Sequence, residues 1–464
     1  MAVHVFEALV TYDDSYQVIP QLAVSWDVSE DGLGYRFYLR EGVLFHNGEE
    51  MKADDVVASI DRFRQVSPSS GRLSEVSVVH QVNDYTVEIL LREPCPLLSR
   101  LAAPDPFLAI FPADLAKAYV GSIPVSQFVG TGPYRVCAVN SDGSILLSPF
   151  EDYVADSRFP GPTGFGGFRQ TSSAHLLFVW GETQSERKDG LISGVYDYGG
   201  ILGLAQAEEL EDCVSVETHI MKPVYTPVIE INHRSPLLEL LEFRKALSAG
   251  LDLERILRCI ALDMEAFFRM SPGLLFGEQT LWCTDVGADI YLHYDTNDAL
   301  ELLAASGYTS DPLVLLVCES SYWSRRCAEE IVAELSVIGI PIEVLMTDRA
   351  TQLDMLRVGM DWDLAVNWSG VCFDPLDVTV RVGCSQSQAN GYCSGEADAM
   401  IERLATCNPL TQRQQVLAEL QLHVWEYVPF IRIGDVFGLD ATAAWIRGYS
   451  SFYNSPRFWT ITTN

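Results

Sequence analysis

The chain has 464 residues, more than one ordinary core requires, so we expect two or three domains at about 150 residues each. Sixty-three acidic residues against 31 basic ones leave a formal charge of −32, which disfavours nucleic acid and anionic membranes as partners. The apolar runs fall short of the ~20 residues that a membrane-spanning helix needs. We therefore expect a soluble globular chain.

The first well-defined elements lie between residues 34 and 63. Residues 35–40 alternate apolar and polar side chains, which predicts a strand with one buried face. Residues 56–63 place apolar side chains at helical spacing. Asp54 and Asp55 fall in the first turn of that helix, where backbone N–H groups lack partners, so we interpret both as structural residues.

Residues 18–63 resemble the signature of the extracellular solute-binding proteins that serve peptide and nickel ABC importers. In that family an LAxSWxVSxDGxxYxFxLRxGVxFHxG run leads into an ADDVxxSxxR helix, and both are present here. The resemblance continues through GTGPY at 130–134, through 227–257 and through DWDLAVNWSGVCFDPLD at 361–377. It covers the chain from about residue 5 to 455. GTGPY lacks the Lys-Ser/Thr of a phosphate loop, and we interpret it as a turn that crosses between lobes.

The resemblance implies an α/β fold, a two-lobed periplasmic-binding-protein-like clamp (type II, cluster C) with an additional third domain. Lobe I would combine residues 1–20, 130–230 and 430–464, the additional domain would be 21–129, and lobe II would be 231–429. Such lobes close around a ligand because only the closed state contacts it from both sides. The family's earlier N-terminal segments are absent, which we attribute to trimming or to a misplaced start.

The resemblance also suggests a ligand site. Trp368, followed by Ser369, matches a position where the family packs an indole against the ligand. Arg349 lies where peptide-binding relatives can place an aromatic residue, and its planar fork could pair with a carboxylate or a phosphate. Glu230 matches another lining position. The alternatives are a core tryptophan, a surface arginine and an ordinary strand carboxylate. Weaker candidates are Tyr225, Trp323 and Arg432.

The eleven cysteines and eight histidines form no CxxC pair and no HExxH motif, so we expect no metal site and no cofactor. Cys384 and Cys393 bracket a short polar loop and are a plausible disulfide. Some dipeptide-binding members of the family carry a cysteine pair at a similar place. Cys259 and Cys283 are a second, weaker candidate pair.

The function that the resemblance implies is capture of a small solute, peptide-like or a modified peptide, for delivery to an ABC permease in the membrane. We expect a monomer in the periplasm or anchored outside the cell. Where peptide-binding relatives carry an Asp for the peptide ammonium, this chain has Val371, and positions for an Arg to the carboxylate correspond to Leu356 and Ala365.

Ordinary peptides are therefore in doubt, and an oligosaccharide, an opine or a nickel chelate stays open. A sensory module on the same fold is another alternative. We expect no enzyme, because the chain has no GxSxG motif and no Ser/His/Asp set that would favour a hydrolase.

Overall fold

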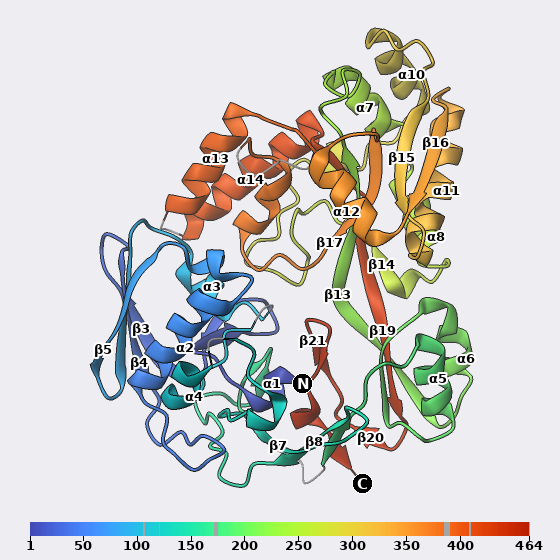
Figure 1. Ribbon diagram of the computed structural model, residues 1–464. Coiled ribbons are helices and arrows are strands. Elements are labelled where there is room, and N and C mark those ends of the chain that lie inside the picture. The colour runs from blue at the N-terminus through green and yellow to red at the C-terminus, as the bar shows by residue number, and fades with distance from the viewer. Residues whose placement is uncertain (105–106, 120, 171–174, 385–389, 408–409, 464) are drawn as a thin grey trace. The chain divides into compact units, whose positions relative to one another are not determined.

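The computed structural model describes residues 1–104, 107–119, 121–170, 175–384, 390–407 and 410–463 (Figure 1). The chain forms two compact units: unit 1 is Met1–His219 with Asp440–Asn464, and unit 2 is Ile220–Leu439. It passes from one unit to the other within two long strands, β13 (Val216–Ile231) and β19 (Asp435–Ala443). The α/β class is confirmed, while the predicted separation of residues 21–129 as a third domain stays a prediction.

Unit 1 contains a four-stranded antiparallel sheet in the order β3-β4-β6-β5 (Ala23–Val28, Gly34–Leu39, Thr86–Leu91 and Val76–Asn83). The predicted alternation in β4 is confirmed, because Tyr35, Phe37 and Leu39 are buried. Helix α2 (Ala53–Val66) packs against β5 and β6.

The first turn of α2 shows why two acidic residues stand there. The Asp55 carboxylate accepts hydrogen bonds from the backbone N–H groups of Lys52 and Ala113, each at 2.7 Å. Asp54 forms an ion pair with Lys117 of α4 (Ala113–Ala118), at 2.9 Å. The interpretation of Asp54 and Asp55 as structural residues is therefore confirmed.

The rest of unit 1 is built from short elements. They include α1 (Ala2–Val5), β1 (Val10–Tyr12), β2 (Val18–Pro20), α3 (Leu97–Ala102), β7 (Tyr134–Val139), β8 (Ile145–Pro149), β11 (Leu176–Phe178), α5 (Gln184–Ile192), β12 (Tyr198–Leu202) and α6 (Ala207–Glu211). The GTGPY turn holds the end of α1, since Gly132 N–H donates to the Val5 carbonyl at 2.9 Å. The expectation that this turn crosses between lobes is wrong, because residues 130–134 lie inside unit 1 and the crossings are at 219/220 and 439/440.

Unit 2 is organised by three parallel strands: β15 (Leu313–Cys318) pairs with β16 (Ile342–Thr347) on one side and with β17 (Leu364–Ser369) on the other. Antiparallel to β17 runs β13, with Thr226 opposite Ser369. Helix α11 (Tyr322–Val337) follows β15, and α12 (Arg349–Val358) follows β16. Because the three strands are parallel, their carboxyl ends and the starts of both helices lie at the same edge of the sheet.

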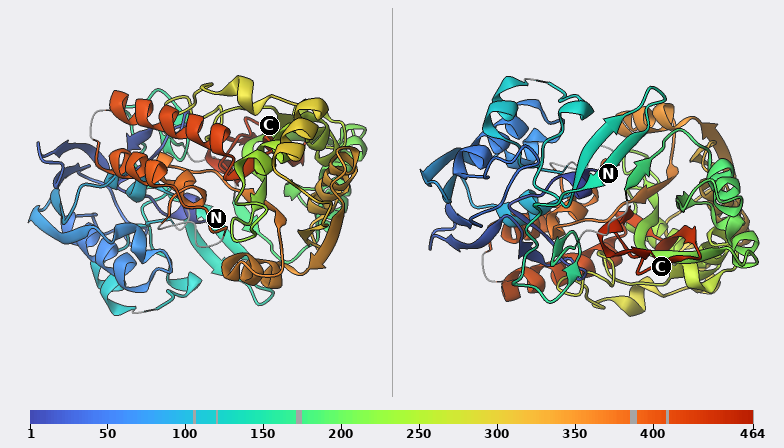
Figure 2. Two further views of the ribbon diagram at one scale, coloured as in Figure 1. Left: turned by 90° about the horizontal axis from the view of Figure 1, so that it is seen from above. Right: turned by 90° about the horizontal axis from the view of Figure 1, so that it is seen from below.

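The apolar core of unit 2 gathers between this sheet and its helices, and includes Phe243, Leu257, Leu315 and Ile331. Helices α7 (Leu241–Ala249) and α10 (Thr296–Ala305) pack together, as do α8 (Leu253–Ile260) and α11. Helices α13 (Gly395–Thr406) and α14 (Leu410–Tyr427) lie side by side (Figure 2). Shorter elements complete the unit: β14 (Phe268–Arg269), α9 (Ala288–Tyr291) and β18 (Phe430–Arg432).

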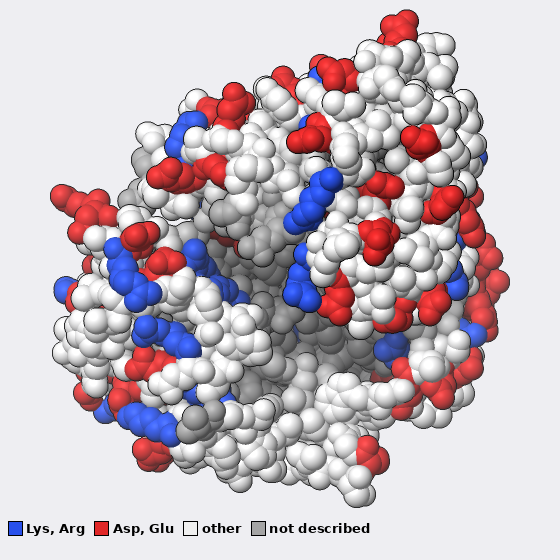
Figure 3. Space-filling view, turned by 45° about the horizontal axis from the view of Figure 1, so that its top comes forward, with Lys and Arg blue, Asp and Glu red and all other residues white. Residues whose placement is uncertain are grey.

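On the face in Figure 3, Asp and Glu side chains are interspersed with Lys and Arg. Among the residues that the structure describes, none of the helices is long and apolar enough to cross a membrane.

Candidate functional site

Four of the predicted site residues meet at the carboxyl edge of the parallel strands in unit 2. Trp368 is near the end of β17, Arg349 begins α12, and Trp323 lies in the first turn of α11. The Arg349 guanidinium carbon is 3.8 Å from the Trp368 ring centroid, and the Trp323 ring stands edge-on to Trp368 at 5.9 Å. Tyr225 of β13 continues the contact, with its ring 5.2 Å from that of Trp323. We call Tyr225, Trp323, Trp368 and Arg349 the edge cluster.

Trp368 is 37% exposed although two other side chains of the edge cluster, Trp323 and Arg349, contact its ring. A core tryptophan would be covered, so the alternative of a buried packing residue does not describe Trp368. Partly exposed aromatic surface next to a cation is suited to stacking on a planar or apolar part of a ligand. The geometry therefore favours a binding surface at this edge.

The Arg349 side chain is held by neutral groups. Its Nη1 donates to Gln352 Oε1 at 2.7 Å and to Asn367 Oδ1 at 3.2 Å. Gln352 is itself fixed, since its amide nitrogen donates to the Val366 carbonyl at 2.9 Å. Within the described residues no carboxylate lies in ion-pair range of Arg349, and desolvation lowers the pKa of the guanidinium.

Glu230 and Ser369 belong to a second group of side chains. They are joined by Arg381, which was not among the predicted site residues. Arg381 donates through Nε to Glu230 Oε1 at 2.9 Å and through Nη1 to Ser369 Oγ at 2.7 Å. Asn367 Nδ2 donates to the same Glu230 oxygen at 2.9 Å. The buried Glu230 carboxylate is thus already neutralised, and its role as a ligand contact stays a prediction.

Arg432 lies in the interior of unit 2. Its side chain is 2% exposed, forms an ion pair with Asp435, and donates to the Ser271 carbonyl at 2.7 Å. Asp435 also accepts from Arg269, at 2.6 Å. Next to this network is a hollow of about 20 Å³, the size of a single water, lined among others by Thr226, Ser369 and Arg432. The contacts of Arg432 fit a structural ion pair.

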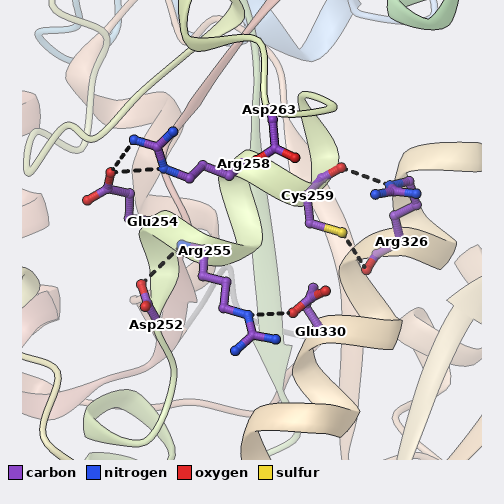
Figure 4. Close-up of a pocket in the computed structure, with 8 residues that line it drawn as sticks. All are labelled: Asp252, Glu254, Arg255, Arg258, Cys259, Asp263, Arg326 and Glu330. Atoms are coloured by element: carbon purple, nitrogen blue, oxygen red, sulfur yellow. Dashed lines mark hydrogen bonds and ion pairs between the residues drawn. The ribbon is translucent and has the colours of Figure 1, made fainter.

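A larger hollow of about 430 Å³ lies between α8 and α11 (Figure 4). Its arginines are engaged: Arg258 pairs with Glu254 and Arg255 with Glu330, each at 2.9 Å. The Cys259–Cys283 disulfide, the weaker candidate pair, is wrong. The Cys259 thiol points to the Arg326 carbonyl, 3.8 Å away, and both cysteines are free thiols.

Cys384 and Cys393 are joined by a disulfide in the structure, with an S–S distance of 2.12 Å. Residues 385–389, inside that loop, lie outside the described residues. Among the described residues, no three His, Cys, Asp or Glu side chains lie together in a group that could hold a metal ion.

The three positions at which peptide-binding relatives would carry charges are apolar and buried here. Val371, Leu356 and Ala365 are 8%, 5% and 0% exposed. These three positions therefore provide no charged group for a ligand, whereas the edge cluster provides a cation and aromatic surface.

Ligands of open α/β sheets bind outside the carboxyl ends of parallel strands, and the edge cluster occupies that place. Fold and site together are those of a protein that binds a small solute. The chain belongs to the bacterial extracellular solute-binding proteins, family 5, whose model matches residues 17–390. Proteins of this family are transport components and not enzymes.

Individual relatives agree with this assignment. The di/tripeptide-binding protein 2 of Pseudomonas aeruginosa is 24% identical over 482 residues, covering 94% of this chain and 84% of that protein. The structure of HbpA2 from Haemophilus parasuis superimposes with a TM-score of 0.81 at 20% identity, covering 99% of this chain and 94% of HbpA2. A dipeptide-binding protein of a Pseudoalteromonas species, solved with Met-Leu, gives a TM-score of 0.77 at 18% identity, covering 100% and 95%.

Proposed function

We propose that this protein captures a small solute outside the cytoplasm and delivers it to the permease of an ABC importer. Family membership supports the role, and the half-exposed Trp368 at the carboxyl edge of β17 is the observation that carries the binding site. The protein works as a monomer, either in the periplasm or anchored at the outer face of the cell membrane.

The solute is a modified peptide or a peptide-like conjugate. Relatives are named for di- and tripeptides, which supports a solute of this size. An unmodified dipeptide needs a counter-charge for its ammonium, and burying an ammonium without one is costly. Val371 provides none, and the Glu230 carboxylate is paired with Arg381. Oligosaccharides, opines and nickel chelates are the competing cargo classes.

Thermal unfolding in the presence of a solute panel tests this proposal. The panel contains dipeptides, blocked and conjugated peptides, oligosaccharides, opines and nickel chelates. A solute at a hundredfold above its dissociation constant stabilises the folded state by about 2.7 kcal/mol, so one class should raise the unfolding temperature.

The variant Trp368→Ala should lose most of that stabilisation. Trp445→Ala is the matched control, because Trp445 is a comparably exposed tryptophan at 48% and lies in β-rich unit 1, outside the edge cluster. A panel in which no solute stabilises the protein, or equal binding by Trp368→Ala and wild type, would contradict the proposal.

A further inference from the structure

We propose that the solute carries an anionic group, a carboxylate or a phosphate, and that Arg349 binds it through its open Nε and Nη2 edge. The inference deepens the proposed function and rests on it. It assigns a charge to the cargo and a role to one side chain.

The hydrogen bonds of Arg349 leave one side of its guanidinium unused. Both acceptors, Gln352 Oε1 and Asn367 Oδ1, are bonded to Nη1. In the part of the chain that the structure describes, Nε and Nη2 have no acceptor. Those two N–H groups form the parallel fork that carboxylates and phosphates bind in bidentate fashion.

The surroundings keep this fork in place. The guanidinium lies against the Trp368 ring at 3.8 Å, which fixes its plane, and Gln352 and Asn367 fix its far end. A preorganised side chain loses little conformational entropy when a ligand binds. The free fork is therefore positioned before the solute arrives.

The other arginines near this edge contrast with Arg349. Arg381 is paired with Glu230 at 2.9 Å, and Arg432 is paired with Asp435. A buried or half-buried guanidinium without a carboxylate is costly, and its desolvation lowers the pKa of Arg349. An anionic group of the solute would supply the missing counter-charge.

The N-terminus of helix α11 adds a positive electrostatic potential that favours an anionic ligand. Helix α11 has 16 residues, its N-cap is the neutral Ser321, and its first turn contains no acidic residue. Trp323 in that turn contacts Trp368, so the positive end of α11 lies at the edge cluster. Helix α12 contributes less, since the Asp348 carboxylate already accepts from the N–H groups of Ala350 and Thr351.

The test uses sodium acetate and sodium phosphate as probes, with sodium chloride at equal ionic strength as the reference. The whole chain is labelled with 5-fluorotryptophan, and the Trp368 resonance is assigned by its loss in Trp368→Phe. We expect acetate, phosphate or both to move this ¹⁹F resonance saturably, while chloride does not. The probe that binds more tightly identifies the cargo anion as carboxylate or phosphate.

The variant Arg349→Gln should weaken the binding of that probe by about tenfold or more, the range for losing hydrogen bonds to a charged group. Arg357→Gln is the matched control, because Arg357 lies on the same helix, is 76% exposed, and its loss changes the net charge equally. It should bind like wild type. Circular dichroism verifies that both variants are folded.

Three results would overturn the inference: no saturable movement with either probe, equal binding by Arg349→Gln and wild type, or the same movement with chloride. If any of these results is obtained but a solute of the panel still stabilises the protein, the solute-binding proposal holds and only the inference of an anionic group is wrong. Saturable anion binding through Arg349 without any stabilising panel solute supports the anionic site and counts against the cargo classes in the panel.

Discussion

The Arg349 guanidinium stacks on the Trp368 ring, 3.8 Å from its centroid, and so couples the start of α12 to the end of β17. A cation–π contact at a partly exposed site contributes about 0.5–1 kcal/mol. We expect a double-mutant cycle with Arg349→Gln and Trp368→Leu to give a coupling energy of that size in urea unfolding. The same cycle with Arg357→Gln in place of Arg349→Gln should give a value near zero. Equal coupling energies in the two cycles would contradict a direct contact.

Arg381 neutralises the buried carboxylate of Glu230, so replacing Arg381 should lower the unfolding free energy strongly. In Arg381→Met the Glu230 side chain, which is 7% exposed, would stay buried without its arginine, and we expect a loss of about 3–5 kcal/mol in unfolding free energy. The control is Arg403→Met, since Arg403 and Glu419 form an exposed pair worth less than about 1 kcal/mol. Adding Glu230→Gln to Arg381→Met should recover part of the loss. A similar small effect at both arginines would show that Glu230 does not need the pair.

The GTGPY turn tolerates no side chain at its first residue. A Cβ atom on Gly130 would lie 2.1 Å from the Val5 carbonyl oxygen and 2.6 Å from Phe6 Cδ1. We expect Gly130→Ala to lower the unfolding free energy by about 1–3 kcal/mol, the usual cost of overpacking. Gly71→Ala is the control, because a Cβ there meets nothing within 4 Å, and it should be neutral or slightly stabilising. Urea unfolding distinguishes the two.

Glu334 on α11 should make stability depend on pH. Burial raises the pKa of its carboxyl to about 7, and the neighbouring carboxylates of Asp252 and Glu330 act in the same direction. The folded state therefore holds this proton more tightly than the unfolded state, whose pKa is 4.5. The resulting stabilisation is fully present below pH 4.5 and is lost as the pH rises through about 7.

Glu334→Gln removes this titration and keeps an oxygen for the Asp252 N–H, which donates to Glu334 at 2.6 Å. Relative to wild type, the variant should gain about 1 kcal/mol or more between the acidic and the alkaline end of that window. The exposed Glu343 of β16 provides the control substitution, Glu343→Gln. Parallel pH profiles of wild type and Glu334→Gln would refute the assignment.

The disulfide between Cys384 and Cys393 closes a loop over a sequence separation of 9. Restricting the unfolded chain in this way contributes about 2–3 kcal/mol. The double variant Cys384→Ser/Cys393→Ser should lose that amount, and a reductant should then have no further effect on it. Cys137→Ser, at an exposed free thiol, is the control and should match wild type. An unchanged double variant would mean that the loop is held by other contacts.

Local patterns predicted local structure well. The alternation at residues 35–40 is the buried face of β4, and the helical spacing of apolar side chains at residues 56–63 is the buried face of α2. These features depend on residues within a few positions of one another, so the sequence contains all the information needed to find them.

The site was only partly predictable, because its contacts join distant segments. Arg381 reaches Glu230 across 151 residues, and no spacing marks such a pair. Arg432 was a weaker candidate for ligand contact, and in the structure a carboxylate three residues away, Asp435, binds it. Trp368, Trp323 and Tyr225 were predicted separately. Their rings meet because β15, which precedes the helix of Trp323, runs parallel to β17, and β13, which carries Tyr225, pairs antiparallel with β17.

The two strands through which the chain passes between its units also set an order of events during synthesis. Unit 2 is one continuous stretch, Ile220–Leu439, whereas unit 1 lacks residues 440–464 until the ribosome has finished unit 2. Those last residues are essential to the interior of unit 1, where the rings of Phe458 and Trp459 pack around His4 at centroid distances of 5.4 and 4.9 Å. The ring of His4 can therefore reach these contacts only after residues 458 and 459 are made, and unit 2, which is one continuous stretch, can complete its core first.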